Sequence, residues 1–206
     1  MPNEGKQNLE RVAIFIDGSN FYFGLKKAGK KTTIDFYKLA IELATTKRKL
    51  IRLYYYNAPV HKEEDEEKYK SQQRFFEGLK STSYVTVRLG RLEKRTTTIK
   101  DALRNIQNDK DAQEIIKAVG EKNFSYYVEK GVDVSIAVDM LRLAHQDAYD
   151  TAILISADGD FATALEAVKD LGKHAEVAFF KNTFSYHLRN ACDKKIYLDD
   201  LIERCY

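Results

Sequence analysis

The chain of 206 residues contains no tryptophan, only two prolines and only two cysteines. Cys192 and Cys205 form no CxxC pair, so they predict neither a zinc site nor a disulfide framework, and reduced thiols are expected. No apolar run approaches the roughly 20 residues that cross a bilayer, and the polar N-terminus lacks the apolar core of a signal peptide. We therefore expect a cytoplasmic protein without a membrane segment, with residues 1–10 as a flexible leader.

The charge is nearly balanced, with a net value of +3, which is too small to predict nucleic-acid binding by itself. Acidic side chains concentrate at 61–69, and basic ones at 24–31, 46–52 and 88–95. A solvated helix face explains each cluster equally well when it is taken alone. Together, the basic clusters favour a rim that neutralises phosphates.

Apolar segments with strand and helix periodicity alternate along the chain. Strands are predicted at 11–17, 49–60, 84–92, 150–156 and 174–180, and helices at 18–29, 35–45, 63–81, 132–146 and 160–172. This alternation predicts an α/β protein with a three-layer Rossmann-like fold, a mainly parallel central sheet and helices on both faces. We expect a single domain over 11–206, interrupted at about 94–125 by a polar insertion or flap with one short helix around 109–119.

Aspartates occupy the ends of two predicted strands. Asp17 ends the first strand, and Asp158 and Asp160 follow the strand at 150–156. Ligands of open α/β sheets bind outside the carboxyl ends of strands, where the strand order reverses. Asp133 begins a predicted helix, and Asp139, about 240° further round it, is expected only in a supporting role. Each of these residues also has an ordinary alternative as a turn residue or a helix N-cap.

Several carboxylates at one edge repel one another and raise one another's pKa, which a divalent cation relieves. Oxygen ligands without histidine or cysteine favour Mg²⁺ or Mn²⁺ over zinc, and none of the four histidines is assigned as a ligand. The sequence therefore predicts an acidic site for Mg²⁺ or Mn²⁺.

Three segments, FIDGSNFY (15–22), KGVDVSIAVDML (130–141) and ISADGDFATAL (155–165), resemble in order the signature blocks of the NYN domain. The resemblance is to the LabA-like branch of the PIN-like nuclease superfamily, and it runs from about Arg11 to about Leu201 without covering 94–125. Family members often carry Ser-Gly-Asp-Gly-Asp in the third block. Ala157 departs from this pattern and puts the geometry of that turn in question.

The resemblance implies a metal-dependent ribonuclease, with endonucleolytic cleavage expected, that uses one or two Mg²⁺ or Mn²⁺ ions. By position, the catalytic and metal-ligating residues are Asp17, Asp133, Asp158 and Asp160. Supporting or substrate-orienting roles are expected for Ser19, Asn20, Asp139 and Ser156, and Ser156 is expected to hydrogen-bond Asp17 from the neighbouring strand end.

The expected substrate is single-stranded or structured RNA. Basic side chains near the insertion neutralise phosphates, and tyrosines that follow a polar stretch stack on unpaired bases. The residues predicted to bind RNA are Arg88, Arg91, Lys94, Arg95, Tyr126, Tyr127 and Lys130.

Two other functions are consistent with parts of the pattern. The first is a non-catalytic RNA- or protein-binding regulatory module on the same fold. The second is a Mn-dependent nucleotide-sugar transferase that uses Asp158-Gly159-Asp160 as a DxD motif, although this leaves Asp17 and Asp133 unexplained. The chain has no GxxxxGK[ST] loop, no GxGxxG, and no DxDxT after the first strand, and it leaves a homodimer or a protein partner open.

Overall fold

The computed structural model describes residues 9–45, 47–98, 101, 123–183 and 185–206. Most of the leader predicted at 1–10 lies outside these residues. The short helix predicted around 109–119 also lies outside them.

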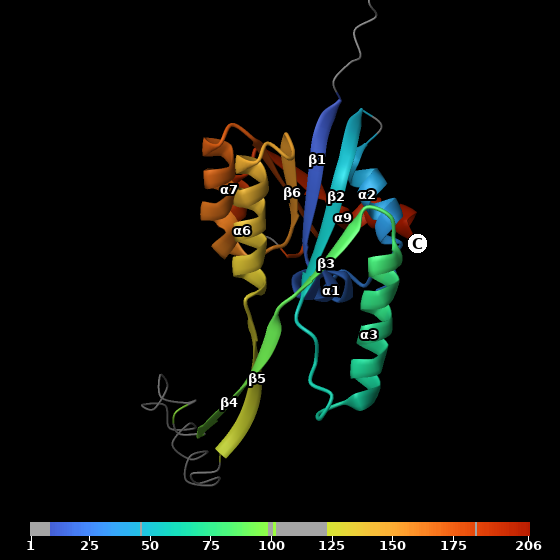
Figure 1. Ribbon diagram of the computed structural model, residues 1–206, viewed down its shortest axis with the longest axis vertical. Coiled ribbons are helices and arrows are strands. Elements are labelled where there is room, and N and C mark those ends of the chain that lie inside the picture. Colours follow the sequence, from blue (N-terminus) through green and yellow to red (C-terminus); the bar gives the residue numbers. More distant parts are fainter. Residues whose placement is uncertain (1–8, 46, 99–100, 102–122, 184) are drawn as a thin grey trace, which may run out of the picture.

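The central sheet has six strands in the order β3-β2-β1-β6-β7-β8, and every neighbouring pair is parallel. A parallel sheet covered on both faces needs nearly continuous apolar strands, and the first and fourth predicted strands have that composition. The predicted α/β class with a parallel sheet is thus confirmed (Figure 1). The strands are β1 (Glu10–Asp17), β2 (Arg48–Asn57), β3 (Val85–Leu89), β6 (Thr151–Ile155), β7 (His174–Phe179) and β8 (Lys194–Tyr197).

Helices cover both faces of the sheet and make three layers. Along β1, Ile14 and Ile16 enter one core while Ala13 and Phe15 enter the other, because successive side chains of a strand point to opposite faces. The first core packs under α1 (Gly18–Lys27), α2 (Phe36–Ala44), α3 (Glu66–Ser81), α9 (Leu198–Leu201) and the 3-10 helix η3 (Ile202–Cys205). The second packs under α6 (Val132–His145), α7 (Ala162–Asp170) and α8 (Tyr186–Ala191).

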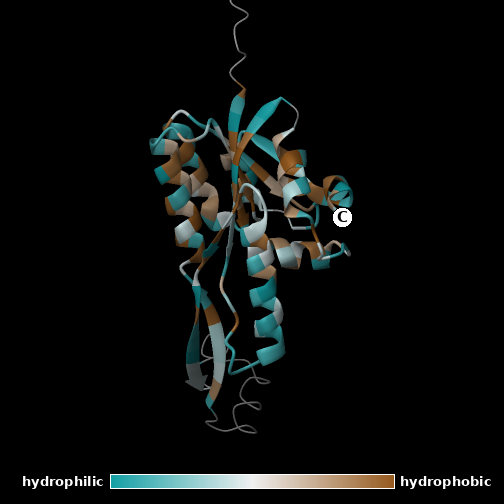
Figure 2. Cartoon of the chain, turned by 45° about the vertical axis from the view of Figure 1, so that its right-hand side comes forward, coloured by the Kyte–Doolittle hydropathy of each residue, from teal (hydrophilic) through white to brown (hydrophobic). Residues whose placement is uncertain are grey.

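Colouring by hydropathy shows the central strands as a largely apolar layer between helices with polar outer faces (Figure 2). Among the described helices, none has the length and apolar character required to span a bilayer.

Two further strands, β4 (Arg91–Thr98) and β5 (Asn123–Lys130), pair antiparallel in a ribbon that projects away from the sheet (Figure 1). The single strand predicted at 84–92 is therefore wrong, because it breaks at Gly90 into β3 and β4. A Cβ at Gly90 would lie 2.7 Å from the Lys130 carbonyl oxygen, so the two chain segments approach too closely for any side chain. The insertion predicted at 94–125 overlaps this ribbon at 94–98 and 123–125, and residues 99–100 and 102–122 lie outside the described residues.

A buried ion pair holds the amino edge of the sheet. The Arg48 guanidinium donates to both carboxylate oxygens of Glu176, at 3.0 and 2.7 Å, and Glu176 is 3% exposed. Arg48 also donates to Glu10 on β1 at 3.0 Å, and Lys194 lies 3.6 Å from Glu176. These contacts join β2, β1, β7 and β8 at the end of the sheet opposite the aspartates.

Candidate functional site

The site lies where the strand order reverses, between β1 and β6, at the carboxyl ends of both strands. Asp17 ends β1, and its Oδ1 accepts the Asn20 backbone N–H at 3.0 Å, which caps α1. Ser156, just past β6, donates to Asp17 Oδ2 at 3.3 Å, as its position at the neighbouring strand end suggests. Glycine is required next to Asp17, because a Cβ on Gly18 would lie 2.6 Å from the Tyr56 carbonyl oxygen.

The loop after β6 is held by the same side chains. Asn20 Oδ1 accepts the Ala157 N–H at 2.9 Å, which ties α1 to this loop at the position that departs from the family pattern. Ser156 Oγ accepts the Asp158 N–H at 3.1 Å, and Asp158 Oδ1 accepts the Asp160 N–H at 3.0 Å. Asp158 therefore caps the 3-10 helix η2 (Gly159–Phe161), and Asp160 follows within that turn.

Asp133 lies in the first turn of α6 and is not its N-cap. That position belongs to Gly131, whose φ of 82° places it in the left-handed region without a capping side chain. Burial raises the pKa of Asp133, and the charges of Asp158 and Asp160 raise it further. The first turn of α6 and the loop after β6 therefore present their carboxylates to the same region.

Glu129, which the sequence analysis missed, joins these aspartates from β5. Its Oε2 accepts the Ser19 hydroxyl at 2.8 Å, which links the base of the ribbon to α1. Burial raises the pKa of Glu129, the bond from Ser19 partly offsets this rise, and the charge of Asp133 adds to it. In sequence, the only signal is an acid within the aromatic and basic run YYVEKG, four residues before Asp133.

We call these carboxylates the acidic cluster; its members are Asp17, Glu129, Asp133, Asp158 and Asp160. Burial raises the pKa of Asp17 to about 6, and the charges of Asp133 and Glu129 contribute, despite opposing hydrogen bonds from Asn20 and Ser156. Four separate elements, β1, β5, α6 and η2, supply the members.

The members share an electrostatic environment, but their oxygens do not meet at one point. In the part of the chain that the structure describes, no three His, Cys, Asp or Glu side chains form a group that could hold a metal ion. Ligation of one ion by several members thus requires side-chain rotation. The donor set consists of carboxylates alone, with raised pKa values at Asp17, Glu129 and Asp133, and it has the chemistry that a hard divalent cation prefers.

Asp139 and Arg88 belong to a different network. Asp139 accepts the Tyr56 hydroxyl at 2.9 Å, and its carboxylate lies 2.7 Å from Arg142 and 3.5 Å from Arg88. These contacts join α6 to β2 and β3. The expected roles of Asp139 beside the aspartates and of Arg88 on RNA thus compete with this structural network.

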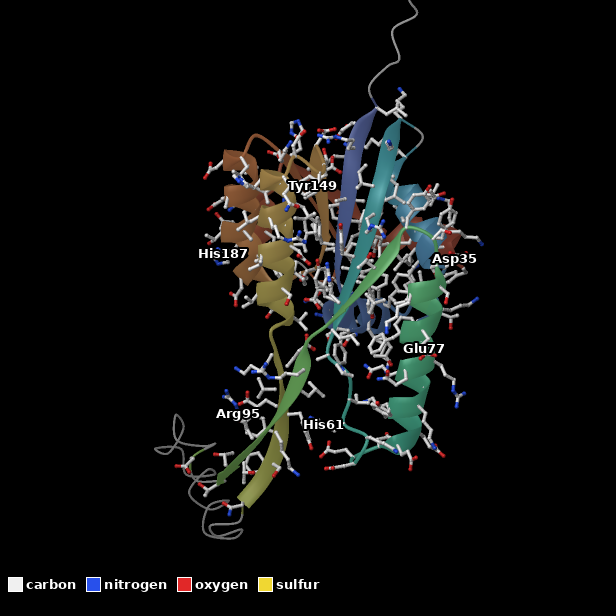
Figure 3. The ribbon with its side chains drawn as sticks, viewed as in Figure 1. Asp35, His61, Glu77, Arg95, Tyr149 and His187 are labelled. Atoms are coloured by element: carbon white, nitrogen blue, oxygen red, sulfur yellow. The ribbon has the colours of Figure 1, made fainter. Side chains whose placement is uncertain are left out.

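The remaining residues expected to bind RNA lie together on the β4–β5 ribbon. Arg91 pairs in register with Lys130, Lys94 with Tyr127, and Arg95 with Tyr126. His61, between β2 and α3, donates from Nε2 to the Leu92 carbonyl at 3.0 Å, and its ring centroid lies 4.8 Å from that of Tyr127. Figure 3 shows His61 on one side of the β4–β5 ribbon and Arg95 on the other. The ribbon thus joins basic and aromatic side chains to Glu129 at its base.

Comparison with known proteins identifies the family of this chain. The model of the NYN domain matches residues 11–199. The Low amplitude and bright protein LabA of Synechococcus elongatus is 25% identical over 195 residues, which cover 93% of this chain and 85% of that protein. A crystal structure of a Vibrio parahaemolyticus protein of unknown function has a TM-score of 0.64 at 20% identity and covers 94% of this chain and 96% of its own, which shows a shared fold. The chain therefore belongs to the NYN domain family, within the PIN-like nuclease superfamily.

Proposed function

We propose that this protein is a metal-dependent ribonuclease that hydrolyses RNA phosphodiester bonds endonucleolytically at the acidic cluster. One observation carries the proposal: five carboxylates from four elements gather at the switch point of the sheet, where three of them have raised pKa values. Like charges are costly to hold together, so a fold that gathers them without a counter-ion gains nothing in stability. Perturbed acids at a ligand edge are typical of functional sites.

The cation that fits the cluster is Mg²⁺ or Mn²⁺. Asp17, Asp133, Asp158 and Asp160 would hold one or two ions, with Glu129 as a further carboxylate. When bound, such ions lower the pKa of water and neutralise charge on the phosphate.

The chain's own residues prepare the site for this chemistry. Ser156 and the backbone of Asn20 fix the two oxygens of Asp17, and Ser19 fixes one oxygen of Glu129. The basic side chains of the ribbon supply positive charge for RNA phosphates next to an acidic site that would otherwise repel them. The acidic cluster therefore carries out catalysis, and the ribbon binds the substrate.

The test is cleavage of a labelled single-stranded RNA in Mn²⁺, in Mg²⁺ and in EDTA. Wild-type protein should cleave only with metal, while Asp17→Asn and Asp158→Asn should be inactive with unchanged circular dichroism. Asp170→Asn is the matched control, because this exposed aspartate ends α7, away from the cluster. Equal rates for wild type and Asp17→Asn would end the proposal.

A non-catalytic RNA-binding role is the second candidate. It is favoured by the absence of a ready metal-holding group among the described residues. It predicts RNA binding that is equal in Mn²⁺ and in EDTA, without cleavage, and no stabilisation of the protein by Mn²⁺ in a thermal denaturation experiment. The transferase alternative gains no support from the family, and the cap that Asp158 provides already gives the DxD segment a structural reason.

A further inference from the structure

A hollow lies at the carboxyl ends of β7 and β8, on the same edge of the sheet as the acidic cluster. This cavity, here called the β7–β8 pocket, has a volume of about 500 Å³ and is lined by Phe179, Lys181, Arg189 and Tyr197. The hollow is wide open to solvent, so it suits one unit of an extended strand better than an enclosed small molecule. Two cations and two aromatic rings around one hollow make a chemical pattern that core packing does not require.

The buried ring of Phe179 holds the aromatic side of the pocket in place. Phe179 is 4% exposed, and its ring centroid lies 5.4 Å from that of Tyr197, with the planes at 78°. Tyr197 is 46% exposed, so much of its ring remains open to solvent. A large aromatic surface held in place by a buried ring is suited to stacking with a nucleobase, because the ring loses little freedom on binding.

The cationic side lies directly against this ring. Lys181 Nζ is 6.0 Å from the centroid of Tyr197, and Asp199 fixes the lysine's backbone by accepting its N–H at 3.0 Å. Arg189, on α8, adds a second positive charge to the lining. A phosphate held by Lys181 would bring its own nucleoside within reach of the tyrosine ring.

The pocket lies close to residues that hold the acidic cluster in place. Phe179 also lines a small crevice shared with Asn20, Ser156 and Ala157, the residues that hold Asp17 and the loop after β6. The strand order places β7 and β8 on one side of β1 and β6, whereas the ribbon continues from β3 on the other side. Pocket and ribbon therefore lie on opposite sides of the acidic cluster.

We propose that the β7–β8 pocket binds one nucleotide of the RNA strand, with its phosphate on Lys181 and Arg189 and its base against Tyr197. The strand then crosses the acidic cluster between the pocket and the ribbon. This inference rests on the proposed ribonuclease function and adds a substrate subsite to it. Anchoring on both sides of the acidic cluster suits cleavage within a strand.

The experiment measures binding of a labelled single-stranded oligoribonucleotide to the full chain in EDTA, where metal-dependent cleavage does not occur. Lys181→Ala and Tyr197→Ala should each weaken binding by about fivefold or more, since stacking and phosphate contacts are both lost. Lys49→Ala, at the amino end of β2, and Tyr37→Ala, with a ring 42% exposed on α2, are the matched controls and should bind like wild type.

The salt dependence separates the two roles. Lys181→Ala should reduce the slope of log K against log salt by about 0.7 for the lost phosphate contact, whereas Tyr197→Ala should leave it unchanged. Tyr197→Phe should restore binding, because it keeps the ring. If Tyr197→Ala does not fold, Lys181→Ala, at an exposed residue, carries the test.

Wild-type affinity in both Lys181→Ala and Tyr197→Ala would overturn the proposal. The proposal would also be overturned if Tyr197→Ala weakened the binding of adenosine monophosphate but not that of the oligonucleotide. The pocket would then bind free nucleotides instead of the strand. Cleavage is scored separately with Mn²⁺. If RNA binding depends on the pocket but no cleavage occurs, the proposed function is wrong and the subsite stands. If cleavage occurs but RNA binding does not depend on the pocket, the subsite is wrong and the proposed function stands.

Discussion

Asp17→Asn should stabilise the protein in EDTA at high pH while it abolishes cleavage. Asp17 is 5% exposed and faces the charges of Asp133 and Glu129. Asparagine has nearly the same shape, keeps an oxygen that can cap α1, and removes the negative charge. The variant therefore separates the electrostatic cost of the carboxylate from its structural contribution.

The magnitude follows from the pKa of Asp17, which rises from 3.8 to about 6. One pKa unit corresponds to about 1.4 kcal/mol, so the ionised carboxylate destabilises the folded protein by about 3 kcal/mol. A raised pKa means that the folded state holds its proton more tightly. The contribution of Asp17 to stability is therefore greatest below pH 3.8, falls as the pH rises from 3.8 to about 6, and stays low above it.

Asparagine cannot accept both hydrogen bonds that reach the two oxygens of Asp17, from Asn20 and from Ser156. The lost bond costs about 1 kcal/mol. We therefore expect the variant to be more stable than wild type by about 2 kcal/mol at pH 8 and by about 0.5 kcal/mol at pH 5. The difference between the two pH values depends on the charge alone.

Urea unfolding followed by circular dichroism at pH 8 and pH 5, with EDTA present, measures both values. Asp170→Asn, which removes an exposed carboxylate at the end of α7, should change stability little at either pH. A variant that is less stable than wild type at both pH values, by the same amount, would refute the reasoning. It would show that Asp17 serves the fold mainly as a helix cap.

The other predictions concern three further positions. Glu129→Gln should lower the rate of RNA cleavage by about 10- to 100-fold with unchanged circular dichroism; a wild-type rate would remove Glu129 from the site. Gly18→Ala should destabilise the protein by about 1–3 kcal/mol in urea unfolding, since its Cβ meets the Tyr56 carbonyl. Arg48→Ala should lower the free energy of unfolding by about 3 kcal/mol, because it leaves Glu176 buried without its arginine partner. Cleavage at saturating RNA should persist. An unchanged unfolding midpoint would contradict this prediction.

The sequence predicts much of this fold because its core strands are locally distinctive. The run from Arg11 to Asp17 is apolar and β-branched, which identifies a buried strand, and the polar turn that follows places Asp17 at its carboxyl end. The same holds for the strand before Asp158. Alternating strands and helices then leave few topologies other than a parallel sheet.

The ribbon escaped prediction because its defining contacts are distant along the chain. Apolar residues alternate from Val85 to Leu89, and the phase shifts at Gly90. Such a shift is also typical of a β-bulge within one strand, so it does not show that the strand leaves the sheet there. Glu129 reaches the acidic cluster only because β5 pairs with β4 and Ser19 bonds its carboxylate. Pairing between residues 25 to 39 positions apart leaves no local periodicity to detect.

The ion pair that stabilises the sheet and the acidic cluster lie at opposite ends of β1. β1 has eight residues, so Glu10 near the Arg48–Glu176 pair and Asp17 in the acidic cluster are about 23 Å apart. This exceeds both the Debye length of about 8 Å in physiological salt and the spacing beyond which substitutions act additively. The amino edge can therefore be re-engineered for heat resistance without altering the electric field in which the phosphodiester would be cut.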